Sequence, residues 1–282
     1  MSETIKIMTN RIKPFLRWAG GKRWLVKSIS NFLPKEFNNY HEPFLGGASI
    51  FLHLKSNNLI SGDSFLSDSN EELINAYEQI KQYPEVIIKE LKKLKNTKEN
   101  YYRIRSWIPR TSQKKAARFI YLNKTSFNGI YRVNLKGEYN VPYGFKETKD
   151  LFEFENILNI SKILNQGVNV ECNDFFSVMD NVQGKDLVFL DPPYTVAHEN
   201  NGFIKYNQKI FLWEDQERLF QLLQEINQKG AYYILTNAAH KNINTLFSKI
   251  GSMHQVQRSS NIGGKGAKRT KVNEFIFTNI KI

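Results

Sequence analysis

Short apolar runs alternate with amphipathic stretches along most of this chain. Apolar runs bounded by turn residues predict buried strands, and apolar positions at helical spacing predict helices. The predicted strands span residues 41–47 (running into a glycine turn), 65–68, 168–172, 187–191, 231–236, 253–258 and 272–278, and the predicted helices span 48–56, 71–95, 113–123 and 214–228. Strands interleaved with helices favour an α/β fold whose mostly parallel sheet is covered on both faces.

The middle of the chain has a different pattern. Residues 96–149 are rich in basic and aromatic side chains and contain a hairpin signature, in which 131–133 and 139–141 flank a turn that ends at Gly137. Glycine there can supply the positive φ that such a turn needs. We therefore expect an inserted domain. Its expected boundaries are 71–159, and they interrupt a sheet domain formed by 1–70 and 160–282.

Charge adds a constraint on the partner. The 282 residues carry 40 Lys and Arg against 27 Asp and Glu, a formal net charge of +13. Such an excess favours a polyanionic partner, although a solvated basic surface would account for it as well. The one cysteine, Cys172, excludes an internal disulfide and fits a reducing compartment. Because it falls in a predicted strand, we expect it in the core.

Neither a secretory leader nor a membrane span is predicted. Residues 1–13 lack the apolar stretch of a signal peptide. No uncharged apolar run approaches the roughly 18 residues of a membrane helix. We expect a soluble cytoplasmic protein.

The most informative motif is Asp191-Pro192-Pro193-Tyr194, which follows the apolar run 187–190. Two prolines end the hydrogen bonding of the strand and hold the backbone extended, which leaves a carbonyl oxygen without its usual partner. A carboxylate, a carbonyl and an aromatic face then meet at one strand end. They suit a planar heterocycle with an exocyclic amine, because two acceptors take the amine hydrogens and the ring stacks. A proline-terminated strand of another α/β protein is the plainer interpretation.

A glycine-rich motif, residues 15–22 (FLRWAGGK), lies near the amino terminus. It is not a phosphate-binding P-loop, because Leu16 stands where the first glycine is needed and Arg23 where Ser or Thr is needed. Its glycines would still let the backbone approach a ligand, with Trp18 as a stacking face and Lys22 as a positive charge. A turn with a structural tryptophan would explain the motif equally.

Residues 42–48 (EPFLGGA) form a strand-to-helix turn without the G-x-G-x-x-G pattern, which disfavours dinucleotide binding. Asp68 ends the next predicted strand. An acid about 20 residues after such a glycine turn binds ribose hydroxyls in nucleoside-binding α/β folds. Together the two features indicate a ligand with a ribose but without a required pyrophosphate. Asp68 could equally cap the following helix.

These motifs, in this order, resemble those of DNA adenine-N6 methyltransferases of the GATC-modifying kind. The matching segments are 15–22 (FLRWAGGK), 42–47 (EPFLGG), 68–70 (DSN), 122–134 (LNKTSFNGIYRVN), 137–144 (GEYNVPYG), 191–194 (DPPY) and 259–274. The resemblance covers nearly the whole chain. It departs at Lys124 and Thr125, where arginine and another residue are expected, and Arg17 stands where lysine is also common. It implies a Rossmann-like methyltransferase fold that binds S-adenosyl-methionine, with an insert that recognises double-stranded DNA.

The resemblance also implies roles for individual residues. The catalytic group would be Asp191, Pro192 and Tyr194. The methyl donor would contact Trp18, Lys22, Phe44, Asp68, Asp174, Phe175 and Asp191. The DNA would contact Arg17, Phe127, Asn128, Ile130, Arg132, Pro142, Lys265 and Arg269. Within these sets, Asp68 would hold the ribose hydroxyls of the donor, Asp174 and Phe175 its adenine, and Arg132 a guanine of GATC.

The expected mechanism is a direct displacement. Asp191 and the carbonyl of Pro192 would accept the two hydrogens of the target amine, whose lone pair could then attack the sulfonium methyl. Tyr194 would stack on the flipped base. Neither a metal ion nor a covalent enzyme intermediate is required. The basic segment 258–271, which contains five Lys and Arg and no acid, would contact phosphates.

Other functions fit parts of the pattern. Residues 191–194 would serve any flipped planar amine, so methylation of cytosine N4 or of adenine in RNA is the nearest alternative. A DNA-binding regulator that keeps the fold as a scaffold is another, although it would not need to retain the acid, the prolines and the aromatic ring. We expect a monomer, and a cognate restriction endonuclease is a candidate partner.

Overall fold

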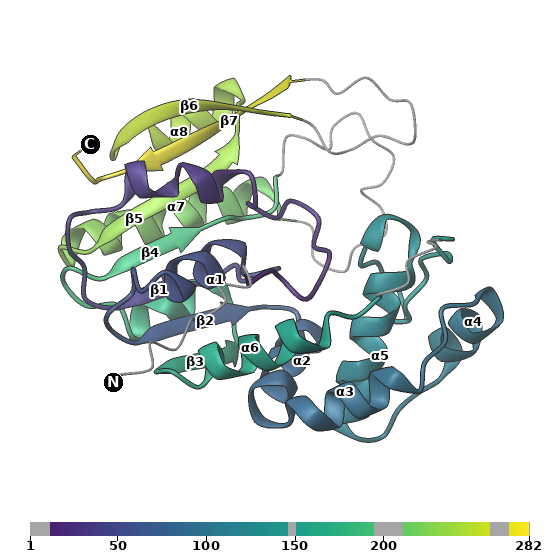
Figure 1. The fold of residues 1–282 in the computed structure, drawn as a ribbon. Helices are drawn as coiled ribbons and strands as arrows, with labels where there is room; N and C mark the ends of the chain where they lie inside the picture. Colours follow the sequence, from purple (N-terminus) through teal and green to yellow (C-terminus); the bar gives the residue numbers. More distant parts are fainter. Residues whose placement is uncertain (1–11, 146–150, 195–210, 260–270, 282) are drawn as a thin grey trace, which may run out of the picture.

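A single sheet lies at the centre of the computed structural model, which describes residues 12–145, 151–194, 211–259 and 271–281. In these segments seven strands pair in the order β3-β2-β1-β4-β5-β7-β6. The strands are β1 (Tyr40–Glu42), β2 (Ser64–Asp68), β3 (Val168–Cys172), β4 (Leu187–Leu190), β5 (Tyr232–Ala238), β6 (Ser252–Ser259) and β7 (Lys271–Thr278). The first five run parallel, whereas β7 is antiparallel to both β5 and β6. The expected α/β fold with a mostly parallel sheet is confirmed (Figure 1).

Helices cover both faces of the sheet and build the insert (Figure 1). They are α1 (Ser49–Ser56), α2 (Glu71–Gln82), α3 (Pro84–Lys92), α4 (Lys98–Ser106), α5 (Ser112–Thr125), α6 (Phe154–Leu164), α7 (Trp213–Gln228) and α8 (Lys241–Phe247). Short 3-10 turns are η1 (Leu25–Lys27), η2 (Ile29–Phe32), η3 (Phe127–Gly129) and η4 (Phe175–Asp180). Across the described part of the chain, no helix is both long enough and apolar enough to cross a membrane.

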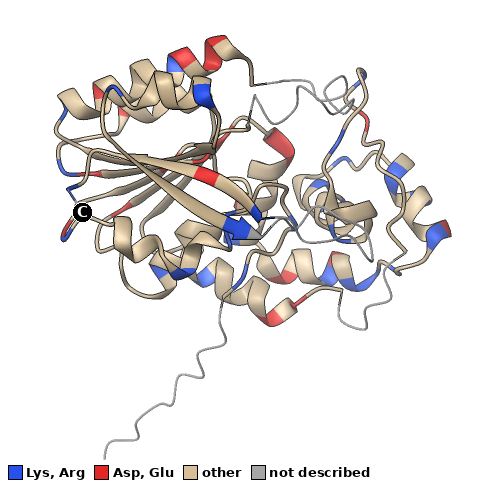
Figure 2. Cartoon of the chain, turned by 90° about the horizontal axis from the view of Figure 1, so that it is seen from above, with Lys and Arg blue, Asp and Glu red and all other residues tan. Residues whose placement is uncertain are grey.

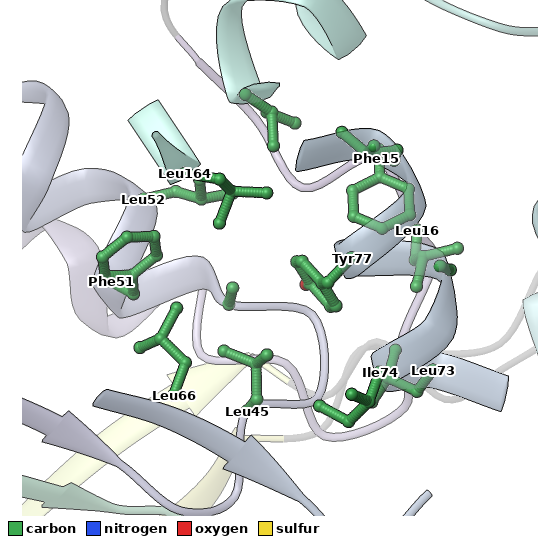
Figure 3. Packing of buried hydrophobic residues seen from close by; sticks show 14 of the residues in the cluster. Phe15, Leu16, Leu45, Phe51, Leu52, Leu66, Leu73, Ile74, Tyr77 and Leu164 are labelled. Atoms are coloured by element: carbon green, nitrogen blue, oxygen red, sulfur yellow. The ribbon is translucent and has the colours of Figure 1, made fainter. Parts of the chain in front are cut away.

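Alternate residues of the central strands enter two different hydrophobic clusters. In β4, Leu187 and Phe189 belong to a cluster with residues of α1, α2 and α6, whereas Val188 and Leu190 belong to another with residues of α7 and α8. Consecutive strand residues point to opposite faces. The unbroken apolar run at 187–190 is therefore what a strand covered on both faces requires. Figure 3 shows part of the first cluster.

Two expectations about local structure were wrong. The helix expected at 71–95 is two helices, α2 and α3, because Pro84 has no N–H to continue α2 and instead opens α3. Cys172, expected in the core, is exposed. It is the last residue of β3, which is an edge strand of the sheet.

The insert is built on α5, which packs against α2, α3 and α4. The expected hairpin turn is confirmed: Val133 and Tyr139 form an antiparallel bridge, and Gly137 has a φ of 77°. Phe119 and Tyr121 of α5 belong to the same hydrophobic cluster as Leu187 and Phe189 of β4. The insert and the sheet domain therefore share a core, and the expected boundaries at 71–159 stay a prediction.

Candidate functional site

The candidate site lies where the strand order reverses, between β1 and β4. Ligands of open α/β sheets bind outside the carboxyl ends of the strands at such a switch point. Glu42 ends β1, Asp68 ends β2, and Asp191 directly follows β4. Because these strands are parallel, the sheet brings three carboxyl groups to one edge.

Asp191 is held by two donors. Lys22 Nζ lies 2.6 Å from its Oδ1, and the hydroxyl of Thr236 on β5 donates to the same oxygen at 2.7 Å. Among the described residues none donates a hydrogen bond to Oδ2. Burial raises the pKa of Asp191, and the two donors, Lys22 above all, lower it. The site thus contains a largely buried carboxyl with one oxygen fixed and the other available as an acceptor.

Pro192 and Tyr194 complete the motif. In the described part of the backbone no N–H donates to the carbonyl of Pro192, which agrees with the expectation of an unpaired acceptor at the strand end. The hydroxyl of Tyr194 donates to Glu274 Oε2 at 2.7 Å, and Lys22 Nζ lies 4.9 Å from the centre of the Tyr194 ring. The Tyr194 ring is therefore held at its hydroxyl by Glu274, and the Lys22 ammonium lies beside the ring.

Glu274 and Arg258 also belong to this site. The sequence indicated no individual role for Glu274, and only a phosphate contact for the segment that begins at Arg258. Glu274 is 1% exposed and stands on β7 opposite Ala238, at the carboxyl end of β5. Its Oε1 accepts from Arg258 Nε, and its Oε2 lies 3.8 Å from Lys22 Nζ. The sequence offered one signal for Glu274, which is an acid directly before the apolar run 275–277. An acid buried beside such a run must have a partner, because charged residues are almost never fully buried unless they are paired.

Glu42 is a second buried carboxyl at the same edge. Its Oε2 accepts from the hydroxyl of Tyr40 at 2.7 Å and from the N–H of Phe51 at 3.2 Å. The pKa of Glu42 is raised to about 8, mainly by burial; the Tyr40 hydroxyl lowers it, and the nearby Asp191 contributes to the rise. At neutral pH Glu42 is therefore a neutral acid inside the sheet edge.

The glycine turn after β1 forms a close cradle with Asp68. Asp68 Oδ2 accepts from the N–H of Gly46, and its Oδ1 accepts from the N–H of Asn70, both at 3.0 Å. A Cβ at Gly46 would lie 2.8 Å from Trp18 Cδ1, so only glycine fits there. The hydroxyl of Tyr77 on α2 fixes the turn by donating to the Gly46 carbonyl at 3.1 Å.

The alternative reading of Asp68 as a helix cap is wrong. The N-cap of α2 is Asn70, whose side chain accepts from the N–H of Leu73. Burial raises the pKa of Asp68, and the backbone N–H groups lower it. Asp68 is thus a braced carboxyl at the end of β2, in the place expected for a ribose ligand.

An aromatic cluster follows β3. The rings of Phe44 and Phe175 stack with centroids 5.2 Å apart, and Phe211 packs against both. Asp174 caps η4 and forms an ion pair with Arg218 of α7 at 2.7 Å. The expected contacts for the donor's adenine are therefore adjacent, but the Asp174 carboxylate already has a partner in Arg218.

Trp18 connects the amino-terminal motif to the insert. Its ring stacks on Tyr131 with centroids 5.8 Å apart and packs at a tilt on Phe119 of α5. The hydroxyl of Tyr131 donates to Glu72 Oε2 at 2.8 Å. Trp18 is thus both a wall beside the glycine turn and a structural contact, so neither sequence-based interpretation excludes the other.

The residues expected to contact DNA gather around the η3 turn. The amide of Asn123 accepts from the N–H of Arg17 and donates to the carbonyls of Arg17 and Gly129. A Cβ at Gly129 would lie 2.6 Å from Arg17 Cβ, so the arginine packs directly on this turn. Within the described segments Arg17 Nη1 is buried with no hydrogen-bond partner. Burial lowers the pKa of Arg17.

The other expected DNA contacts are accessible. Phe127, Asn128 and Pro142 are exposed, and Ile130 is partly exposed. Arg132 is oriented by Asn140, because its Nε donates to the side-chain oxygen at 2.7 Å and its Nη2 to the carbonyl at 3.3 Å. Lys265 and Arg269 lie outside the described residues.

Figure 2 shows Lys and Arg on the helices of the insert and at the end of the β6–β7 pair. Within the described segments, no cluster of three or more His, Cys, Asp or Glu has the arrangement of a metal site.

Comparisons with known proteins agree with this geometry. The family model of the D12 class N6 adenine-specific DNA methyltransferases matches residues 18–262. The type II methyltransferase M1.LlaDCHI of Lactococcus lactis subsp. cremoris is 34% identical over 277 residues, covering 95% of each chain. The type II methyltransferase M.MjaIII of Methanocaldococcus jannaschii is 35% identical, covering 80% of this chain and 84% of its own.

A further relative is the DNA adenine methylase of Escherichia coli K12, which is 28% identical over 94% of each chain. A family match over residues 18–262, with relatives 34% and 35% identical, supports adenine methylation in DNA over the scaffold, cytosine and RNA alternatives. The acid, the prolines and the aromatic ring of residues 191–194 stand at the switch point, where open α/β sheets bind their ligands. The chain belongs to the D12 class of N6 adenine-specific DNA methyltransferases, enzymes that use S-adenosyl-methionine.

Proposed function

We propose that this enzyme methylates N6 of the adenine in GATC within duplex DNA, by everting the base and displacing the methyl group directly. The observation that carries the mechanism is Asp191, a largely buried carboxyl with Oδ1 fixed by Lys22 and Thr236 and with Oδ2 free of donors from the described residues. The unpaired carbonyl of Pro192 supplies a second acceptor beside it.

The residues present fit the methyl donor. The cradle of Gly46 and Asp68 offers a braced carboxylate for ribose hydroxyls, and the stacked Phe44 and Phe175 offer an apolar surface for an adenine. Trp18 borders the cradle. S-adenosyl-methionine supplies an electrophilic methyl group on a sulfonium and leaves as a neutral thioether.

The protein orients the target amine. That nitrogen is a poor nucleophile because its lone pair is delocalised into the ring. When Asp191 Oδ2 and the Pro192 carbonyl accept its two hydrogens, the nitrogen can pyramidalise and direct the lone pair at the methyl carbon. As the C–N bond forms, the surplus proton passes to Asp191, whose pKa burial raises. Tyr194 stacks on the everted base and offsets part of the few kcal/mol that eversion costs.

Base recognition is assigned to the insert, residues 71–159, as the target-recognition domain. Arg132 is the proposed reader of a guanine, since an arginine can bond bidentately to O6 and N7 in the major groove. Asn140 orients its guanidinium, and the exposed Phe127, Asn128 and Pro142 lie on the same segment. Arg17 approaches this turn from the sheet domain, with a buried Nη1 that lacks a partner among the described residues.

Replacing Arg132 with alanine should relax specificity at one base. Because a bidentate guanine contact contributes about 1–3 kcal/mol of discrimination, activity on sites altered at that guanine should rise about 5- to 150-fold relative to GATC. The measurement is methyl incorporation into duplexes that carry each single substitution of GATC. Arg103→Ala on α4 is the matched control, because it removes one positive charge of the insert outside the hairpin. An equal loss on all duplexes in Arg132→Ala would assign the residue to a phosphate instead.

The function itself is tested with the purified chain. We expect transfer of tritiated methyl groups from S-adenosyl-methionine to duplex DNA, with the label found in N6-methyladenine and confined to GATC. Label in another sequence would overturn the proposed site but not the activity, and label in RNA would overturn the substrate. Two relatives are named type II methyltransferases, which supports a companion restriction endonuclease for this chain. We also propose that the methyltransferase itself is a cytoplasmic monomer.

A further inference from the structure

We propose that Glu274 is a positioning residue for methyl transfer, which orients the Tyr194 ring and the Lys22 ammonium relative to Asp191. This inference rests on the proposed function. The sequence motifs gave Glu274 no role of its own, although it is the last residue of the matching segment 259–274. It comes from β7, the antiparallel strand beside β5.

The geometry gives Glu274 three partners from three segments. Its Oε2 accepts from the Tyr194 hydroxyl at 2.7 Å and lies 3.8 Å from Lys22 Nζ, and its Oε1 accepts from Arg258 of β6. Glu274 is 1% exposed and Lys22 is 3% exposed. Buried ionic groups are costly unless every oxygen and every N–H has a partner, so this arrangement restricts each partner to a narrow set of positions.

The contact with Tyr194 is the one that bears on the reaction. Tyr194 follows two prolines and has no strand pairing of its own, and its hydroxyl is attached to Glu274. A stacking ring must lie parallel to the base within tight limits, and small misplacements at a reacting centre are costly. Fixing the far end of the phenol restricts the tilt of the ring, which Phe at this position could not achieve.

The contact with Lys22 sets the charge around Asp191. Charged or titratable side chains that face Asp191 or its partners are Lys22 of the amino-terminal motif, Glu42 of β1, Tyr194, Arg258 of β6 and Glu274 of β7. Lys22 lies between two carboxylates, at 2.6 Å from Asp191 and 3.8 Å from Glu274. Without the charge of Glu274, the cations Lys22 and Arg258 would be balanced by Asp191 alone. The Lys22 ammonium would then be attracted to Asp191 only.

The first test is a double-mutant cycle on the single-turnover rate of methyl transfer. Glu274→Gln keeps the size of the side chain and removes its charge, and Tyr194→Phe keeps the ring and removes the hydroxyl. Because the hydrogen bond between these residues loses its charged acceptor in one variant and its donor in the other, each variant should be slowed about 10-fold. Since both changes act on the same charge-assisted contact, the double variant should be slowed no more than about 3-fold beyond the slower single variant. Multiplying losses would overturn the proposal.

The second test is the pH profile of the same rate. Burial is the main cause of the raised pKa of Asp191, and the charge of Glu274 raises it as well. Removing that charge should lower this pKa, so the acid limb of the profile should move to lower pH in Glu274→Gln. A purely structural loss would reduce the rate at every pH and leave the limb in place, and an unmoved limb would therefore count against the proposal.

Controls separate this inference from neighbouring explanations. Glu90→Gln on α3 breaks an ion pair with Lys93 far from the site and should retain the wild-type rate. The Kd of Glu274→Gln for duplex DNA should stay within about 3-fold of wild type, and thermal melting establishes that the variant is folded. If wild type does not methylate DNA, the proposed function fails. If wild type methylates and Glu274→Gln matches it, only the role of Glu274 fails.

Discussion

Replacing Asp191 with alanine should reduce the single-turnover rate of methyl transfer at least about 1000-fold, while binding of duplex DNA survives. The change removes the acceptor Oδ2 that we assign to the target amine. Loss of one preorganised polar group of this kind costs about 10²–10³ in rate in other enzymes. Here the carboxylate would both orient the amine and take its proton, so the upper end is expected. Tritiated-methyl incorporation measures the rate, and fluorescence anisotropy with a labelled duplex measures binding.

The variant needs a companion because Asp191 balances a buried cation. Lys22 is 3% exposed, and in Asp191→Ala its remaining carboxylate is Glu274 at 3.8 Å. Asp191→Asn keeps the shape and an oxygen for Lys22 but loses the charge, and it should be comparably inactive. The exposed Asp180→Ala, at the end of η4, should keep the wild-type rate. Substantial turnover by folded Asp191→Ala would remove this residue from the mechanism.

The sheet was predictable because its strands are locally distinctive. The run 187–190 is apolar without interruption, and prolines follow it at once, so both its burial and its end are recorded in adjacent residues. The strand at 168–172 was predicted with the bounds that β3 has. Its exposure at the sheet edge was not, because strand order depends on pairings between distant segments.

Helix α4 was not predicted, because its pattern of apolar and polar residues is too weak to indicate a helix. Only Tyr101 and Ile104 are buried in it, among charged and polar neighbours, so the apolar period hardly emerges from the sequence. The break between α2 and α3 depends on the single residue Pro84. Apolar residues keep a helical spacing on both sides of it, so the pattern alone predicted one continuous helix.

The residues of the candidate site also differ in how far the local sequence reveals them. Asp191, Asp68 and the glycine turn could be found because each directly follows a strand whose end the sequence marks. Glu274 could not, since its partners Tyr194, Lys22 and Arg258 become neighbours only through the antiparallel placement of β7 beside β5 and β6. Residue type alone also could not show that Lys22 lies against Asp191.

A second large effect is expected at Glu42, as a dependence of stability on pH. Burial raises the pKa of Glu42 to about 8, from an ordinary value of 4.5 in the unfolded chain. Between these values the folded protein holds a proton that the unfolded chain has lost. The unfolding free energy should therefore fall as pH rises through this window, by about 1.4 kcal/mol per pH unit from this group. The contribution is complete below pH 4.5 and lost above pH 8.

Glu42→Gln should remove that dependence. Its amide oxygen can still accept from the Tyr40 hydroxyl and the Phe51 N–H, and it does not titrate. Urea unfolding at pH 5.5, 7 and 8.5 should give a flatter profile for the variant, which should be the more stable protein at pH 8.5. Glu225→Gln on α7 should follow the wild-type profile. Equal slopes in wild type and Glu42→Gln would mean that Glu42 is ionised in the folded protein.

The same variant tests the charge of the cluster around Asp191. A neutral Glu42 adds no negative charge beside Asp191, so Lys22 and Arg258 face only the carboxylates of Asp191 and Glu274. Glu42→Gln should then methylate DNA at neutral pH within about 3-fold of wild type, since the two proteins carry the same charge there. Above pH 8 ionisation of Glu42 would place a second carboxylate near Asp191 in wild type alone, and the two rates should diverge.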